Sequence, residues 1–107
     1  MTAARFRALA LALPEAEESS HFGKADFRVR KHIFAGFNAD GRAYVKLTPE
    51  QQEMLIATEP KMIAPIPGGW GRKGWTLIDQ ERADEALMRS TLRMAWANVA
   101  PKSLQKE

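Results

Sequence analysis

Apolar and polar residues follow one another along this chain with two different periods. Between positions 6 and 13 the apolar residues recur at helical spacing. Thr2 can cap the start of this run, and Pro14 ends it. The pattern predicts an amphipathic helix over residues 3–13 that covers one side of a sheet.

The next part of the chain has the two-residue period of strands. The segments "ADFRVR" and "RAYVKL" alternate apolar residues with basic or aromatic ones, and "IFAGFN" is apolar on both faces. They predict three antiparallel strands, and a fourth is expected before them. The expected strands are 16–21, 25–30, 33–38 and 42–47, with tight turns at Lys31-His32 and at residues 38–41.

A second helix is predicted directly after these strands. Thr48 can cap it, Pro49 suits its first position, and Gln51 stands where a capping box needs it. This helix should span residues 49–57. The segment "APIPGG" that follows contains two prolines, which exclude a central strand and leave a loop or an edge.

The last two elements are a strand at "GWTLID" and a helix that starts near Asp79 and ends before Pro101. The order is therefore α-β-β-β-β-α-β-α. It defines an α+β fold, with an antiparallel sheet and helices on one face. At 107 residues, the chain should form one domain over residues 1–107.

Composition excludes several chemistries. The chain has no cysteine, so disulfides, thiolate catalysis and cysteine-ligated metal sites are absent. Its apolar N-terminal run is too short to span a bilayer. We expect a soluble cytoplasmic protein with no membrane association, no cofactor and no metal. The net charge is +3, and the positive charge concentrates in residues 24–46 and 61–76, which can attract an anionic partner.

The stretch "GGWGRKGWT" has the glycine spacing of a dinucleotide fingerprint, but not its context. A fingerprint follows a strand and opens a helix, whereas these glycines precede a strand pattern. A phosphate-binding P-loop fails too, because Lys73 is followed by Gly74. The better interpretation is a turn between Trp70 and Trp75 that presents Arg72 and Lys73 at its tip, as a basic loop or wing.

No catalytic constellation stands out. Ser19, Ser20 and His21 are adjacent, but adjacent residues of a strand point to opposite faces, and no nucleophile elbow surrounds them. The acidic residues after Pro14 lack a histidine or aspartate at metal-ligand spacing. We therefore expect a protein that is not an enzyme and has no catalytic residues.

The basic strands carry the main functional signal. Alternation places Arg28 and Arg30 on one face of their strand, and Arg42, Tyr44 and Lys46 on one face of theirs. If the two faces coincide, they form a cationic patch with one aromatic ring, as expected of a nucleic-acid platform. The alternative is the solvated side of an antiparallel sheet, which is polar without further function.

Nearly the whole chain resembles the MmcQ/YjbR family of small bacterial proteins. The segments concerned are "LALPEAEESSHFGKADFRVRKHIFAGF", "YVKLTPEQQEML", "GWGRKGWTLID" and "AWANVAPKSL". The most specific motifs are HFG-x-x-x-F, K-L-T-P-E and W-x-x-x-x-W. The resemblance implies a CyaY-like fold, and the family is described from its double-wing-like fold as DNA-binding. The matching positions are His21, Phe22, Gly23, Phe27, Lys46, Gly71 and Trp75.

The frataxin-like side of the resemblance implies iron handling through an acidic first helix. This sequence departs from that pattern, because its first helix contributes Arg5 and Arg7. We therefore expect no iron site.

Two hypotheses about the binding site follow, and a third concerns the partner. The first is a DNA-binding protein that contacts phosphates through Arg28, Arg30, Arg42, Lys46, Arg72 and Lys73. The second is a pocket for a small anionic ligand or a peptide, formed by His21, Lys46, Trp70 and Trp75. The third is a protein-interaction domain that uses the same loop.

Overall fold

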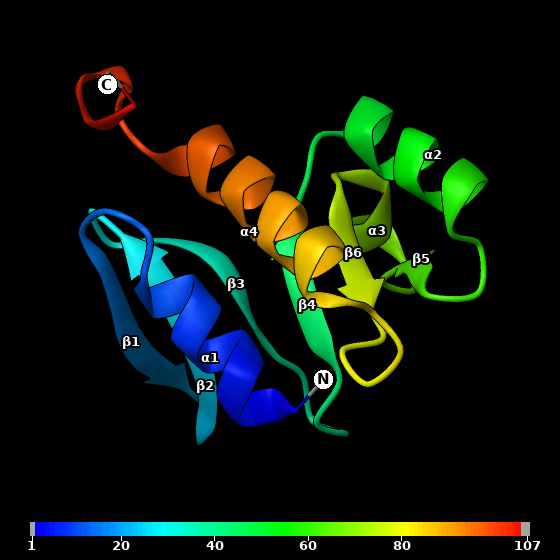
Figure 1. Ribbon diagram of the computed structural model, residues 1–107, viewed down its shortest axis with the longest axis horizontal. Helices are drawn as coiled ribbons and strands as arrows, with labels where there is room; N and C mark the ends of the chain where they lie inside the picture. Colours follow the sequence, from blue (N-terminus) through cyan, green and yellow to red (C-terminus); the bar gives the residue numbers. More distant parts are fainter. Residues whose placement is uncertain (1, 106–107) are drawn as a thin grey trace.

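The computed structural model describes residues 2–105 and contains one antiparallel sheet of six strands, in the order β1-β2-β3-β4-β6-β5 (Figure 1). The elements are α1 (Ala3–Leu11), β1 (Ala16–His21), β2 (Lys24–Val29), β3 (His32–Phe37), β4 (Ala43–Lys46), α2 (Pro49–Thr58), β5 (Ile63–Pro65), α3 (Gly69–Arg72), β6 (Trp75–Ile78), α4 (Glu85–Val99) and the 3₁₀ turn η1 (Lys102–Leu104). The predicted α+β class is confirmed. Of the helices described here, none is long and apolar enough to cross a membrane.

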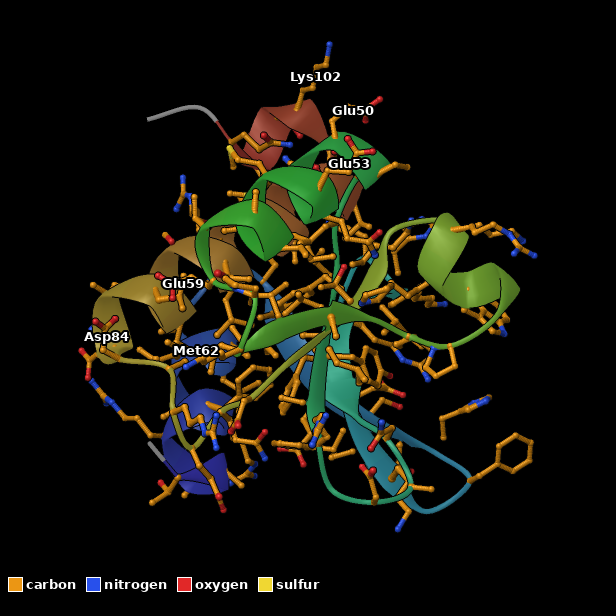
Figure 2. The ribbon with its side chains drawn as sticks, turned by 90° about the vertical axis from the view of Figure 1, so that its right-hand side faces the viewer. Glu50, Glu53, Glu59, Met62, Asp84 and Lys102 are labelled. Atoms are coloured by element: carbon orange, nitrogen blue, oxygen red, sulfur yellow. The ribbon has the colours of Figure 1, made fainter. Side chains whose placement is uncertain are left out.

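The two faces of the sheet have different cover. Helices α1 and α4 lie on one side, and the short helix α3 lies on the other (Figure 2). The core fills the space under α1 and α4, where Phe6, Phe27, Phe34 and Trp96 are fully buried. The Trp96 indole N–H donates to the carbonyl oxygen of Pro14 at 2.9 Å, so its one polar atom is satisfied inside the core.

The helix boundaries follow from capping. Thr48 and Gln51 form the predicted capping box of α2. The predicted start of the last helix near Asp79 is wrong. Asp79 instead accepts hydrogen bonds from the backbone of a turn, and Asp84 caps α4 by accepting from the N–H of Leu87 at 2.8 Å. The first helix ends at Leu11, two residues earlier than predicted.

The hairpin between β2 and β3 also differs from the prediction. Its turn is Arg30-Lys31, with φ of 51° and 71°, and His32 already belongs to β3. The predicted turn Lys31-His32 was one residue late. Strand β2 therefore ends at Val29, and Arg30 lies outside the ladder.

Two short elements were not in the predicted order. Strand β5 pairs with β6 at the edge of the sheet. This position agrees with the prediction that the proline-containing segment forms a loop or an edge strand. Helix α3 occupies part of the expected basic turn. Gly71 and Gly74 are required by close backbone contacts: a Cβ atom would lie 2.0 Å from the Ile66 carbonyl oxygen at Gly71 and 1.8 Å from the Leu47 carbonyl oxygen at Gly74.

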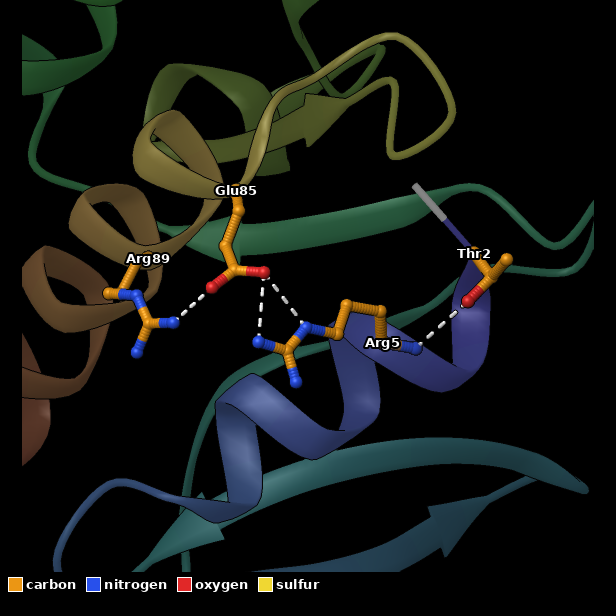
Figure 3. A network of polar contacts seen from close by, with 4 residues as sticks. All are labelled: Thr2, Arg5, Glu85 and Arg89. Carbon is orange, nitrogen blue, oxygen red and sulfur yellow. Dashed lines mark hydrogen bonds and ion pairs between the residues drawn. The ribbon is translucent and has the colours of Figure 1, made fainter.

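An ion network joins α1 to α4 (Figure 3). Arg5 donates to one carboxylate oxygen of Glu85 from Nε at 3.0 Å and from Nη2 at 2.8 Å, and Arg89 binds the other oxygen. The hydrogen bond from Arg5, followed by that from Arg89, lowers the pKa of Glu85. Glu85 and Arg89 stand at the helical i,i+4 spacing that favours such a pair.

Candidate functional site on the open sheet face

We call the side of the sheet opposite α1 and α4 the open face. Val45 and Thr76 pair across β4 and β6 and are fully buried toward the helices. Because successive residues of a strand point to opposite sides, their neighbours Tyr44, Lys46 and Trp75 belong to the open face. Lys46 pairs directly with Trp75 in the β4–β6 ladder.

An aromatic hollow of about 320 Å³ lies on the open face. We use this name for the space lined by His21, Ile33, Tyr44, Ile66, Trp70 and Trp75. The Trp75 ring packs edge to face against Tyr44, with a centroid distance of 5.6 Å, and against Trp70, with 6.2 Å. Trp70 is 61% exposed, so one ring of this cluster is available to a ligand.

Tyr44 is held in the hollow by the absence of a side chain at Gly36. A Cβ atom at Gly36 would lie 2.5 Å from the Tyr44 hydroxyl oxygen, so the phenol occupies the space that any larger residue would need. Burial raises the pKa of Tyr44, and the nearby charge of Asp26 raises it further. The ring therefore presents a neutral hydroxyl at physiological pH.

Two lysines stand over the tryptophans. The Lys46 Nζ atom lies 5.4 Å from the Trp75 ring centroid and donates to the Lys73 carbonyl oxygen at 2.8 Å. The Lys73 Nζ atom lies 5.3 Å from the Trp70 ring centroid. Both distances are within the range of cation–π attraction. Burial lowers the pKa of Lys46, and the like charge of Lys73 lowers it further.

Arg28 lies on the open face but is already paired. Its guanidinium donates to both carboxylate oxygens of Asp26, at 2.8 and 3.2 Å, and this pairing raises the pKa of Arg28. Asp26 is 1% exposed. Arg28 is therefore needed to compensate a buried carboxylate, a role that the alternation pattern could not show because it does not reveal the burial of Asp26.

Arg30 and Arg42 do not join the predicted patch. The turn that carries Arg30 directs its guanidinium to Glu15, at 2.6 and 3.2 Å. Arg42 precedes β4 and lines a polar hollow of about 260 Å³ with the acidic residues Asp40, Asp79 and Glu81. The expectation that the basic residues of the two strands share one cationic face is therefore wrong for these two positions.

The second predicted set of residues is brought together. His21, Trp70 and Trp75 line the same hollow, and Lys46 stands over Trp75. Sequence reasoning missed Ile33 and Ile66 as lining residues. Ile66 lies between the two prolines, in a segment whose backbone path has no periodic signal.

Arg72 and Lys73 remain close to this site. Arg72 is exposed at the end of α3, and Lys73 follows it over the Trp70 ring. Arg72 lines a neighbouring hollow that shares Ile66 with the aromatic hollow. We use the name cationic rim for Lys46, Arg72 and Lys73. Within residues 2–105, no group of three or more histidine, aspartate or glutamate side chains is placed to hold a metal ion.

The fold and site define a small α+β protein whose sheet is covered by helices on one face and carries an aromatic hollow on the other. The model of the YjbR family matches residues 11–98, and the chain belongs to this family.

The chain is similar in structure to the Deinococcus radiodurans protein DR2400, whose domain carries the designation DUF419. The TM-score is 0.78 at 24% identity, over 95% of this chain and 80% of that one. At this identity the likeness shows the fold alone. No curated protein matches the chain significantly.

Proposed function

We propose that the protein binds DNA through the open face, without catalysing a reaction on it. Lys46, Arg72 and Lys73 contact phosphates, and the exposed ring of Trp70 contacts the nucleotide. The observation that carries this proposal is the position of Lys46 and Lys73, each over a tryptophan at the edge of one hollow. Cations interleaved with aromatic rings are the combination that nucleic-acid platforms use.

The charge around the hollow favours an anion. Its lining contains no carboxylate among the residues described. Lys46 is partly desolvated and faces the positive charge of Lys73, which lowers its pKa. A phosphate group placed between the two ammonium groups would relieve this repulsion, and its binding energy would include that relief.

The proposal differs from a broad basic sheet. Arg28 and Arg30 each hold a carboxylate, and moving either arginine to a phosphate would leave that carboxylate without its partner. We therefore assign phosphate contact to the cationic rim. The family resemblance supports DNA as the polyanion, and the setting is the cytoplasm of a bacterial cell.

The experiment is fluorescence anisotropy with a labelled DNA oligonucleotide of about 16 nucleotides, long enough for one site, measured over a salt series. We compare the wild type with Arg72→Ala/Lys73→Ala and with Arg30→Ala/Arg42→Ala. The second variant removes the same charge away from the hollow. Loss of two phosphate contacts reduces the salt slope by about 1.4 to 1.8.

The proposal expects this reduction only for the first variant. Equal reductions of the salt slope in both variants would mean that net charge alone attracts DNA. Absence of binding by the wild type, in single-stranded and duplex DNA alike, would overturn the proposal.

A small planar anion is a second candidate, because the hollow of about 320 Å³ is near the lower limit of about 300 Å³ for small-molecule sites. Thermal stabilisation by a nucleoside monophosphate favours this candidate if lengthening the ligand to an oligonucleotide adds no affinity. A peptide or protein partner using the same aromatic residues would give no response to either probe.

A further inference from the structure

Phe22 occupies a position that the fold does not explain. It forms the two-residue turn between β1 and β2 with Gly23, has φ of 52°, and is 91% exposed. Two-residue hairpin turns with positive φ at both positions favour Asn-Gly, because asparagine tolerates this backbone conformation and a large aromatic residue does not. Phe22 thus combines an unfavourable backbone conformation with an unburied apolar ring, a combination found where function outweighs stability.

The ring lies beside the aromatic hollow. A neighbouring hollow of about 290 Å³ is lined by His21, Phe22, Lys24, Phe37, Asn38, Ala39 and Tyr44. It shares His21 and Tyr44 with the aromatic hollow. Phe22 and Trp70 therefore line adjoining hollows over a common floor, and among the residues that the structure describes no carboxylate lines either one.

Lysines accompany both rings. Lys24 lines the hollow of Phe22, and Lys73 stands over Trp70. Exposed aromatic faces separated by a shared floor and accompanied by cations suit a flexible polyanion whose bases are free to stack. In a duplex, each base is already stacked between its neighbours, and an aromatic side chain reaches its face only when a base step is opened, which costs free energy.

We propose that the open face prefers single-stranded DNA, with Phe22 and Trp70 as stacking residues for unpaired bases. This inference rests on the proposed function and adds the form of the DNA. Lys24 and the cationic rim follow the backbone of the strand. Protein recognition through the same exposed rings is the alternative that the following experiment separates.

The experiment uses three labelled probes of equal length: a single strand of thymidines, a duplex, and a strand whose central nucleotides lack bases. The last probe keeps the phosphates and removes the stacking partners. Binding of the full chain is measured by anisotropy at fixed salt. We expect the thymidine strand to bind about fivefold or more tightly than the abasic strand, in line with the stacking of at least one base.

Phe22→Asn is the most informative variant, because asparagine suits the turn. It should raise the melting temperature while weakening binding of the thymidine strand about fivefold. Trp70→Ala should weaken binding by a similar factor. The control is Met54→Ala, which removes an exposed apolar residue of α2 that is 52% accessible, and it should leave binding unchanged.

The outcomes separate the two proposals. Tighter binding of the thymidine strand, lost in Phe22→Asn and in Trp70→Ala, supports both. Equal or tighter binding of the duplex or the abasic strand overturns the preference for single strands and leaves DNA binding standing. Unchanged affinity in Phe22→Asn removes Phe22 from the site. If no probe binds, both proposals fail, and the exposed rings are left to a protein partner.

Discussion

The side-chain amide of Gln52 donates to the carbonyl oxygen of Gly71 at 3.0 Å and to the Thr76 hydroxyl oxygen at 2.9 Å. A buried side chain of α2 thus connects α3 to β6, and through them it fixes the position of Trp70 beside Trp75. The aromatic hollow therefore depends on a residue that does not line it.

Replacing Gln52 should loosen this connection. Gln52→Ala leaves a buried carbonyl oxygen at Gly71 and a buried hydroxyl at Thr76 without this donor, and we expect the free energy of unfolding to fall by about 1–3 kcal/mol. The measurement is urea denaturation. Glu53→Ala is the control, because Glu53 lies on the exposed side of the same helix (Figure 2). Equal effects of the two substitutions would contradict the assigned role of Gln52.

The glycines of "GGWGRKG" should differ sharply in how well they tolerate substitution by alanine. A Cβ atom at Gly71 would meet the Ile66 carbonyl oxygen at 2.0 Å, whereas one at Gly69 would meet nothing within 4 Å. We expect Gly71→Ala to destabilise the protein by about 3 kcal/mol and Gly69→Ala to be nearly neutral. Thermal unfolding of both variants checks this. A neutral Gly71→Ala variant would show that α3 shifts away from Ile66 without cost.

Arg28 and Arg30 were predicted to act alike, and the structure predicts that their substitutions differ. Arg28→Ala leaves the buried carboxylate of Asp26 without its partner, and we expect a loss of about 2–3 kcal/mol in the free energy of unfolding. Arg30→Ala removes a pair between exposed side chains, and we expect a much smaller loss because water screens such pairs. Chemical denaturation of the two variants measures the difference. A larger loss for Arg30→Ala would mean that the Asp26 pair is not structural.

The network of Glu85 with Arg5 and Arg89 predicts a pH dependence (Figure 3). Folding lowers the pKa of Glu85 below its ordinary value of 4.5. The ionised carboxylate therefore stabilises the fold above pH 4.5. This contribution is lost as the pH falls through the folded pKa. The wild type should be more stable than Glu85→Gln at pH 7, and the difference should close in acid.

Denaturation curves of the wild type and Glu85→Gln at several pH values test this expectation. Glu53→Gln is a control for the loss of a carboxylate elsewhere. A difference between the wild type and Glu85→Gln that stays constant from pH 7 into acid would contradict the proposed ionic origin.

Much of the fold was predictable because its signals are local. Alternation identified β2 and β4, and the capping box at Thr48 identified the start of α2. The start of α4 was misplaced because two aspartates, Asp79 and Asp84, both offer a capping carboxylate, and only the tertiary structure selects Asp84. Helix α3 has four residues, too few for a periodic pattern.

The site was predictable only in part. The structure places His21, Trp70 and Trp75 around one hollow, but no spacing in the sequence shows that their segments meet. The role of Arg28 depends on the burial of Asp26, which no spacing shows. One residue of error in a turn was enough to place Arg30 on the wrong face, because side chains in a strand alternate with a period of two.

The most direct test of the central claim uses the three tryptophans as reporters in one NMR titration with single-stranded DNA. Trp70 and Trp75 belong to the aromatic hollow, whereas the Trp96 indole is buried and bound to Pro14. Binding at the open face predicts that the indole N–H signals of Trp70 and Trp75 shift while that of Trp96 stays in place. Shifts confined to the backbone signals of α1 and α4, with both hollow tryptophans unchanged, would contradict the account.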